Sequence, residues 1–113
     1  MTVAGMRTDV GAGLVPAHLG RTLAFPGGAS AFGVHDLVGN GWEWTSDVFA
    51  PFDGFTPLPS YPEYSADFFD GQHFVLKGAS PMTARGLVRP GFRNWFRPRY
   101  PYVYATFRCA QDA

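Results

Sequence analysis

Cysteine is nearly missing from this chain. Only Cys109 is present among 113 residues, so an intrachain disulfide framework is excluded. Long apolar runs are missing as well, and no stretch approaches the roughly 20 apolar residues that a membrane-spanning helix needs. The N-terminus also lacks the charged segment, apolar run and cleavage site of a secretory signal. These absences predict a soluble, cytoplasmic protein with no membrane partner.

Long uninterrupted helices are not expected either, because glycine and proline are frequent. The chain contains 14 Gly and 10 Pro, and both residues interrupt regular structure. Apolar residues still make up 46% of the chain and aromatic residues 17%, which favours a folded core over a disordered tail. The length fits one small domain. We expect an irregular leader over residues 1–30, where periodicity is weak, and a folded body over residues 31–113.

The formal net charge is zero, but the charges are separated along the sequence. Residues 36–70 contain acidic residues and no Lys or Arg, whereas residues 71–111 contain basic residues and no Asp or Glu. The simplest interpretation is that the two segments fold against each other. The alternative is a basic face that binds a carboxylate, a phosphate or a nucleic acid. Because the net charge is zero, we do not expect a nucleic-acid partner.

Alternation of apolar and polar residues predicts three short strands. They cover residues 42–48, 73–78 and 103–109. Prolines predict loops over residues 51–64 and 89–102, and one helical turn is predicted from Ser65 as its cap to Gly71 as its end. Cys109 falls on the apolar side of the last strand, so we expect it to be buried. The predicted fold class is α+β, with short antiparallel strands and long loops.

The stretch DLVGNGWEW, residues 36–44, places two carboxylates around a glycine turn. Calcium binds about six to eight oxygen atoms from carboxylates and backbone carbonyls, and glycine lets the backbone turn its carbonyls inward. A calcium site is therefore one interpretation, with the neighbouring tryptophans buried behind it. Its ligands would come from Asp36, Gly39, Gly41 and Glu43. The alternative is that Asp36 caps a turn and Glu43 pairs with a downstream arginine.

Three blocks of sequence, in this order, resemble the formylglycine-generating enzyme family, also called sulfatase-modifying factors. The blocks are GVHDLVGNGWEWTSD at residues 33–47, FVLKGAS at residues 74–80 and YATFRCA at residues 104–110. The resemblance covers about residues 31–113 and implies a C-type-lectin-like fold. The chain would form the C-terminal part of a longer domain, so the fold is expected to be incomplete. The resemblance also implies a structural calcium ion at the four positions named above.

Two branches of this family differ in their chemistry. The formylglycine-generating oxidases hold copper between two cysteines shortly after the segment that matches Gly78-Ala79-Ser80. No cysteine occurs at residues 81–86, so a thiolate copper site is not expected and this activity is the less favoured alternative. Residues 88–109 and 59–69 instead resemble the non-haem iron sulfoxide synthases of ergothioneine biosynthesis. Those enzymes use oxygen to join a cysteine-type thiol to a histidine derivative.

In the enzymes that these segments resemble, the lectin-like domain shapes the substrate pocket, and three histidines of a separate helical domain hold the iron. The histidines of this chain, His18, His35 and His73, are far apart in the sequence. We expect each to be a surface or hydrogen-bonding residue rather than a metal ligand. The resemblance therefore implies a chain that is inactive alone and requires iron from a helical domain or subunit.

Substrate contacts are expected in the aromatic and arginine-rich stretch that follows Asn94. An arginine fork can bind a carboxylate, and aromatic rings can enclose a cation. A tyrosine hydroxyl can also donate a proton. The predicted substrate-binding residues are Trp95, Arg97, Arg99, Tyr100 and Tyr102. The enzymes of this branch bind substrate through an Asp and an Arg, but the corresponding positions of this chain hold Phe96 and Tyr100. The substrate is expected to be a small thiol or a histidine derivative, and this departure leaves its identity open.

Two further expectations complete the sequence-based account. Phe107 and Arg108 are expected to serve the fold, with Phe107 in the core and Arg108 paired to an acid such as Glu43. The alternative function is a stand-alone C-type-lectin-like module, because that fold tolerates loop variation and can bind a ligand without catalysis.

Overall fold

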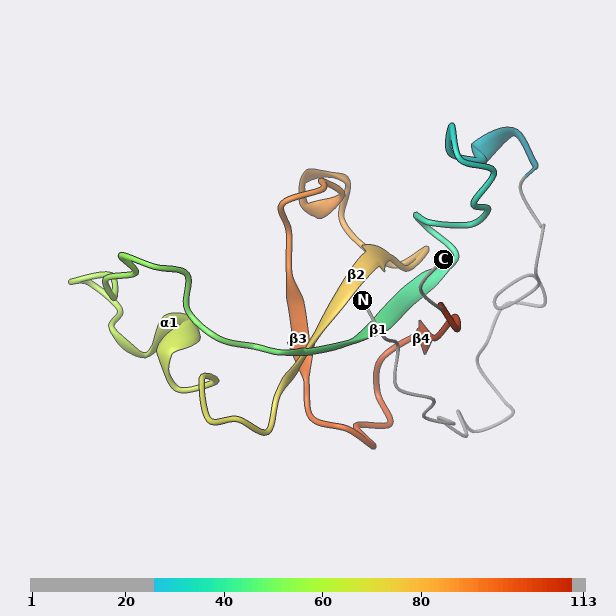
Figure 1. The fold of residues 1–113 in the computed structure, drawn as a ribbon. Helices are drawn as coiled ribbons and strands as arrows, with labels where there is room; N and C mark the ends of the chain where they lie inside the picture. Colours follow the sequence, from blue (N-terminus) through green and yellow to red (C-terminus); the bar gives the residue numbers. More distant parts are fainter. Residues whose placement is uncertain (1–25, 111–113) are drawn as a thin grey trace.

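The computed structural model describes residues 26–110, and its strands form one four-stranded sheet. The strands are β1 (Gly41–Val48), β2 (Phe74–Ala79), β3 (Asn94–Phe96) and β4 (Ala105–Thr106), in the spatial order β3-β2-β1-β4 (Figure 1). The β1–β2 pair is antiparallel, as expected, and the β2–β3 pair is antiparallel as well, but β4 runs parallel to β1. Most of the predicted leader lies outside the described residues, and its described end contains the 3-10 turn η1 (Pro26–Gly28).

The two central strands form because their apolar side chains share one face. Trp42 pairs with Gly78 across the sheet and Trp44 with Leu76. The buried core cluster is made of Trp42, Trp44, Leu76, Val103 and Ala105. Each large apolar side chain contributes about 1.5–3 kcal/mol when fully buried. The predicted burial of both tryptophans is therefore confirmed, and they anchor β1 in the sheet.

The alternation in β1 ends after Trp44. The register between β1 and β2 shifts between Trp44 and Val48. As a result Thr45 is buried and its hydroxyl donates to the Val75 carbonyl at 2.9 Å, while Val48 is exposed. A bulge of this kind turns side chains away from the face that the sequence pattern predicts.

The structure corrects the loop predicted over residues 89–102, because β3 lies within it. Val75 pairs with Trp95 and Leu76 with Asn94. Lys77 also donates from Nζ to the carbonyls of Pro90 and Phe92, at 2.6 and 2.8 Å. The surrounding prolines do not interfere, because none lies within the strand itself.

The last predicted strand is much shorter than residues 103–109. Its pairing with β1 ends at Thr106, opposite Glu43. The predicted burial of Cys109 and Phe107 is wrong, since Cys109 is exposed and Phe107 is 43% exposed. Beyond Thr106 no described strand pairs with this segment, so the side chains that the alternation predicts to be buried do not reach the core.

The segment between β1 and β2 extends away from the sheet and carries the short helix α1 (Glu63–Ala66) (Figure 1). The helical turn predicted from Ser65 to Gly71 is wrong in position. Ser65 lies inside α1 with a φ of 72° and makes no side-chain cap. After it, turns stabilised by backbone bonds from Phe68 and Phe69 lead into β2. In the part of the chain that is described, no helix has the length and apolar character of a membrane span.

Candidate functional site

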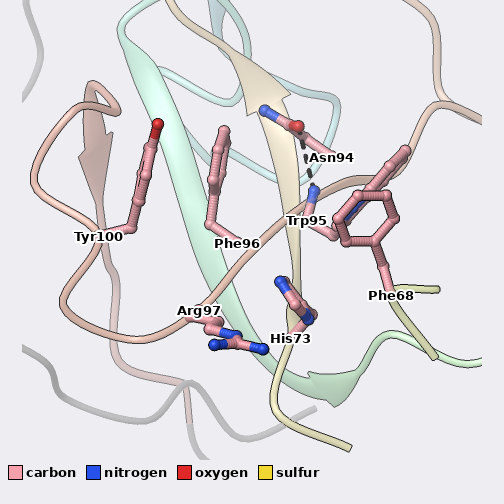
Figure 2. Close-up of a pocket in the computed structure, with 7 residues that line it drawn as sticks. All are labelled: Phe68, His73, Asn94, Trp95, Phe96, Arg97 and Tyr100. Atoms are coloured by element: carbon pink, nitrogen blue, oxygen red, sulfur yellow. Dashed lines mark hydrogen bonds between the residues drawn. The ribbon is translucent and has the colours of Figure 1, made fainter. Parts of the chain in front are cut away.

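A cavity of about 430 Å³ lies beside β3. This volume falls within the range of about 300–1,000 Å³ that is typical of small-molecule sites. The strand and the loop after it contribute five lining residues, and the segment before β2 contributes the other two (Figure 2). The lining residues are Phe68, His73, Asn94, Trp95, Phe96, Arg97 and Tyr100.

Three of the five predicted substrate-binding residues line this cavity: Trp95, Arg97 and Tyr100. The other two, Arg99 and Tyr102, are not part of its wall. Tyr102 is exposed, and its ring stands edge-on to Tyr100 with centroids 5.5 Å apart. Arg99 has a φ of 71° in the turn that leads to Tyr100. The structure therefore brings together the part of the predicted site that immediately follows Asn94.

Trp95 forms a wall of the cavity rather than an open stacking surface. Phe49 stacks on the indole with centroids 4.5 Å apart and planes 7° apart. Phe68 packs against it at 5.4 Å. A second aromatic wall is formed by Phe96 and Tyr100, which stack at 4.7 Å with planes 10° apart. Stacked pairs of this geometry contribute about 0.5–1.5 kcal/mol beyond the area that they bury, so both walls are stabilised by ring contacts.

Asp70 organises the polar end of the cavity. Its Oδ1 atom lies 2.8 Å from Nδ1 of His73 and accepts the Gln72 backbone N–H at 2.8 Å. Its Oδ2 atom accepts a hydrogen bond from Nη2 of Arg97 at 3.2 Å. These donors, the His73 bond foremost, lower the pKa of Asp70 well below its usual range. The carboxylate therefore stays charged and holds both His73 and Arg97 in place.

Sequence reasoning missed four of the lining residues: Phe68, His73, Asn94 and Phe96. It treated His73 as a surface or hydrogen-bonding residue, and the hydrogen bond to Asp70 confirms that reading. The available signal was the Asp-Gly-Gln-His turn, since a carboxylate three residues before a histidine can bind its ring nitrogen. Its closeness to β3 was not visible in the sequence.

The glycine turn lies away from this cavity and is held by an ion pair. Arg108 donates from Nε to Oε2 of Glu43 at 2.8 Å, and from Nη2 to Oε1 of Glu43 and to the His35 carbonyl. The Glu43 bonds raise the pKa of Arg108. The expected pairing of Glu43 with a downstream arginine is therefore confirmed. Together with the Asp70–Arg97 pair, it joins the acidic and basic segments of the chain.

The other predicted calcium positions surround the start of β1. Asp36 has a φ of 56° and Gly39 a φ of 90°, and the Gly39 N–H donates to the Ala79 carbonyl at 3.1 Å. Gly41 begins β1 and packs against the Thr106 side chain. A calcium ion at Glu43 would have to share the carboxylate with Arg108 or displace Arg108 from it. The ion pair therefore does not favour calcium at this position. The calcium site stays a prediction.

Iron ligands are likewise not found in the described region. Within residues 26–110, no three His, Cys, Asp or Glu side chains come close enough together to hold a metal ion. Of the three histidines, His73 lines the cavity and His35 lies next to Arg108 through its carbonyl. His18 lies outside the described residues.

Comparison with known proteins gives consistent matches. Residues 16–113 match the sulfatase-modifying factor enzyme 1-like domain. Hercynine oxygenase of Mycolicibacterium smegmatis is 43% identical over 101 residues, which cover 86% of this chain and 23% of that protein. Ergothioneine biosynthesis protein 1 of Neurospora crassa is 42% identical over 82 residues, which cover 67% of this chain and 9% of that protein. The chain thus spans less than a quarter of the length of these relatives.

Proposed function

The chain belongs to the sulfatase-modifying factor family, and from that premise we propose that it forms the substrate pocket of a sulfoxide-synthase-like enzyme. The names of its relatives, hercynine oxygenase and ergothioneine biosynthesis protein 1, support this branch of the family. The observation that carries the proposal is the cavity beside β3, because Trp95, Arg97 and Tyr100 meet there. The proposed reaction is oxygen-dependent formation of a carbon–sulfur bond between a small thiol and a histidine derivative.

The polar groups of the cavity suit a substrate that carries a carboxylate. Only one guanidinium nitrogen of Arg97 bonds to Asp70, which leaves further donors for a ligand. The Asn94 side-chain oxygen accepts the Trp95 N–H at 3.1 Å. This bond does not use the N–H donors of the Asn94 amide, which can bind a ligand in the cavity that Asn94 lines. The walls made by Phe68, Phe96 and Tyr100 can surround the apolar or cationic part of such a molecule. A zwitterionic amino-acid derivative with an aromatic ring fits this combination.

Iron would supply the oxygen activation in this proposal. Since the described residues offer no ligand set for it, we propose that the iron ligands come from a helical domain or a separate subunit. The role of this chain is then to bind and orient the organic substrates and to exclude water around them. Alone, it should bind substrate without turnover.

A titration of the purified chain with hercynine tests this function, with tryptophan fluorescence as the readout because Trp95 lies in the cavity wall. Saturable binding is expected. Arg97→Ala should weaken it roughly 10-fold or more, because a charge-assisted hydrogen bond contributes about 1.5–3 kcal/mol. Arg85→Ala is the matched control, since Arg85 lies in the exposed turn η2 (Arg85–Leu87) and not in the cavity wall.

Two results of this titration would count against the proposal: the absence of saturable binding, or equal weakening by both arginine variants. Binding that never leads to turnover, even with the iron-bearing part of a hercynine oxygenase added, would instead favour the lectin-like binding module.

A further inference from the structure

We propose that His73 is the proton acceptor for a thiol substrate in this cavity and that Asp70 is the residue that positions it. The inference rests on the proposed function, because it takes a thiol as one of the two substrates. It adds a catalytic role to a residue that the sequence pattern treated as a simple hydrogen-bonding histidine.

The His73 ring is held in one orientation from several sides. Its Nδ1 atom lies 2.8 Å from Oδ1 of Asp70, and the ring stands edge-on to Phe68 with centroids 5.3 Å apart. The His73 carbonyl accepts the Phe49 N–H at 2.8 Å, which fixes the backbone at the start of β2. The side chain is only 12% exposed. A ring that is held by these contacts can present one defined nitrogen to a ligand.

That nitrogen is Nε2. A carboxylate accepts a proton from Nδ1, so the neutral ring carries its hydrogen there and leaves a lone pair on Nε2. None of the described residues forms a hydrogen bond with Nε2, while the residue itself lines the cavity. In Figure 2 the His73 ring stands beside Arg97 at the polar end, below Phe96 and Asn94. The site therefore presents a base to whatever fills the cavity.

The charged and titratable groups around His73 favour proton transfer from a thiol. Asp70 would stabilise the imidazolium that forms, and its carboxylate is itself held by Gln72 and Arg97. Arg97, from the loop after β3, would oppose the imidazolium but stabilise the thiolate, and water screens its exposed side chain. The Tyr100 hydroxyl belongs to the other wall of the cavity. The net effect of these groups is to favour the pair of thiolate and imidazolium.

The step itself is a proton transfer without oxidation. The S–H bond of the substrate breaks, its electron pair stays on sulfur, and a new N–H bond forms at Nε2. The thiolate is the reactive form of the thiol, both as a nucleophile and as a metal ligand. Because a free thiol has a pKa of about 8.5, most of it is protonated at neutral pH without such a base.

The test is an NMR titration of the His73 ring in the full chain, with and without saturating L-cysteine. With cysteine, the apparent pKa of His73 should rise by about one unit or more, a tenfold change in its proton affinity. S-methyl-L-cysteine is the matched ligand, since it keeps the ammonium and carboxylate of cysteine but carries a methyl group in place of the proton on sulfur. It should produce no comparable rise, and the His35 signal serves as the internal control.

Asp70 is tested in the same experiment. Asp70→Asn should abolish the cysteine-dependent rise, and Asp70→Glu should restore part of it, which a purely structural role of Asp70 would not predict. The comparison of the two ligands needs no variant and therefore does not depend on the folding of either one. Cysteine that binds without raising the pKa of His73 would overturn the inference and leave the proposed function standing. Failure of both cysteine and hercynine to bind would overturn both.

Discussion

Arg108→Met is expected to destabilise the fold strongly, because it leaves the Glu43 carboxylate without its cation. Glu43 projects from the central strand β1 with its side chain 16% exposed, whereas the Arg108 side chain is 35% exposed. Both carboxylate oxygens bond to the guanidinium. Methionine keeps the apolar stem of arginine and removes only the charge and the donors. The perturbation therefore reports on the ion pair rather than on lost packing.

The magnitude lies between two limits. An exposed ion pair contributes about 0–1 kcal/mol, and removing one partner of a buried pair costs about 3–5 kcal/mol. Since Glu43 is mostly buried but Arg108 is partly screened by water, we expect a loss of about 2–3 kcal/mol in the free energy of unfolding. For a domain of this size that corresponds to a decrease of roughly 10–20 °C in melting temperature.

Urea unfolding followed by tryptophan fluorescence measures this loss, because Trp42 and Trp44 lie in the core. The double variant Glu43→Gln/Arg108→Met should lose about 1–2 kcal/mol less than the sum of the two single losses, because it leaves no charge unpaired. Arg85→Met is the control at an exposed arginine. A loss under about 0.5 kcal/mol for Arg108→Met, or simple additivity of the two changes, would refute this reasoning.

Three other predictions concern stability. Gly78→Ala should cost about 2–4 kcal/mol in urea unfolding, because Gly78 has a φ of 91° and a Cβ would lie 2.8 Å from the Leu37 carbonyl oxygen. Gly91→Ala, which meets no atom within 4 Å, should change little, and equal losses would contradict this argument. Asp70→Asn should lose stability at neutral pH but not in acid, because a carboxyl with a lowered folded-state pKa stabilises the fold above about pH 4 and loses that effect as the pH falls. Parallel melting curves of both proteins between about pH 3 and 7 would contradict it. If calcium binds at the glycine turn, a chelator should lower the melting temperature, and Glu43→Gln should remove that sensitivity to the chelator. A melting temperature that the chelator does not change would contradict the calcium site.

The central strands of the fold were predictable from sequence, because β1 alternates Trp42 and Trp44 with polar residues and β2 is a short apolar run in which Val75 and Leu76 are both buried. β3 was not predictable in this way, since its residues form a strand through pairing with Val75 and Leu76 rather than through their own pattern. The opposite error occurred at Cys109. There the alternation continues beyond the last paired residue, Thr106, but within residues 26–110 no strand pairs with it there, and Cys109 is exposed.

The candidate site was predictable only where it follows the chain. Trp95 in β3 and Arg97 and Tyr100 in the loop after it lie close together in one segment, which the family resemblance had already singled out. The residues that complete the cavity come from the segment before β2. The contact that joins the two parts, between Asp70 and Arg97, spans 27 residues and depends on the sheet pairing. No local pattern carries that information, so His73 was recognised only as a hydrogen-bonding residue.

The most direct test of the account is an iron-binding and turnover measurement on the purified chain. With Fe(II), oxygen, cysteine and hercynine, the chain alone should bind no iron tightly and form no sulfoxide. Product should appear in mass spectra once the iron-bearing part of a hercynine oxygenase is added, and Arg97→Ala should reduce its yield. Tight binding of one Fe(II) per chain, with turnover in the absence of any added protein, would contradict the account.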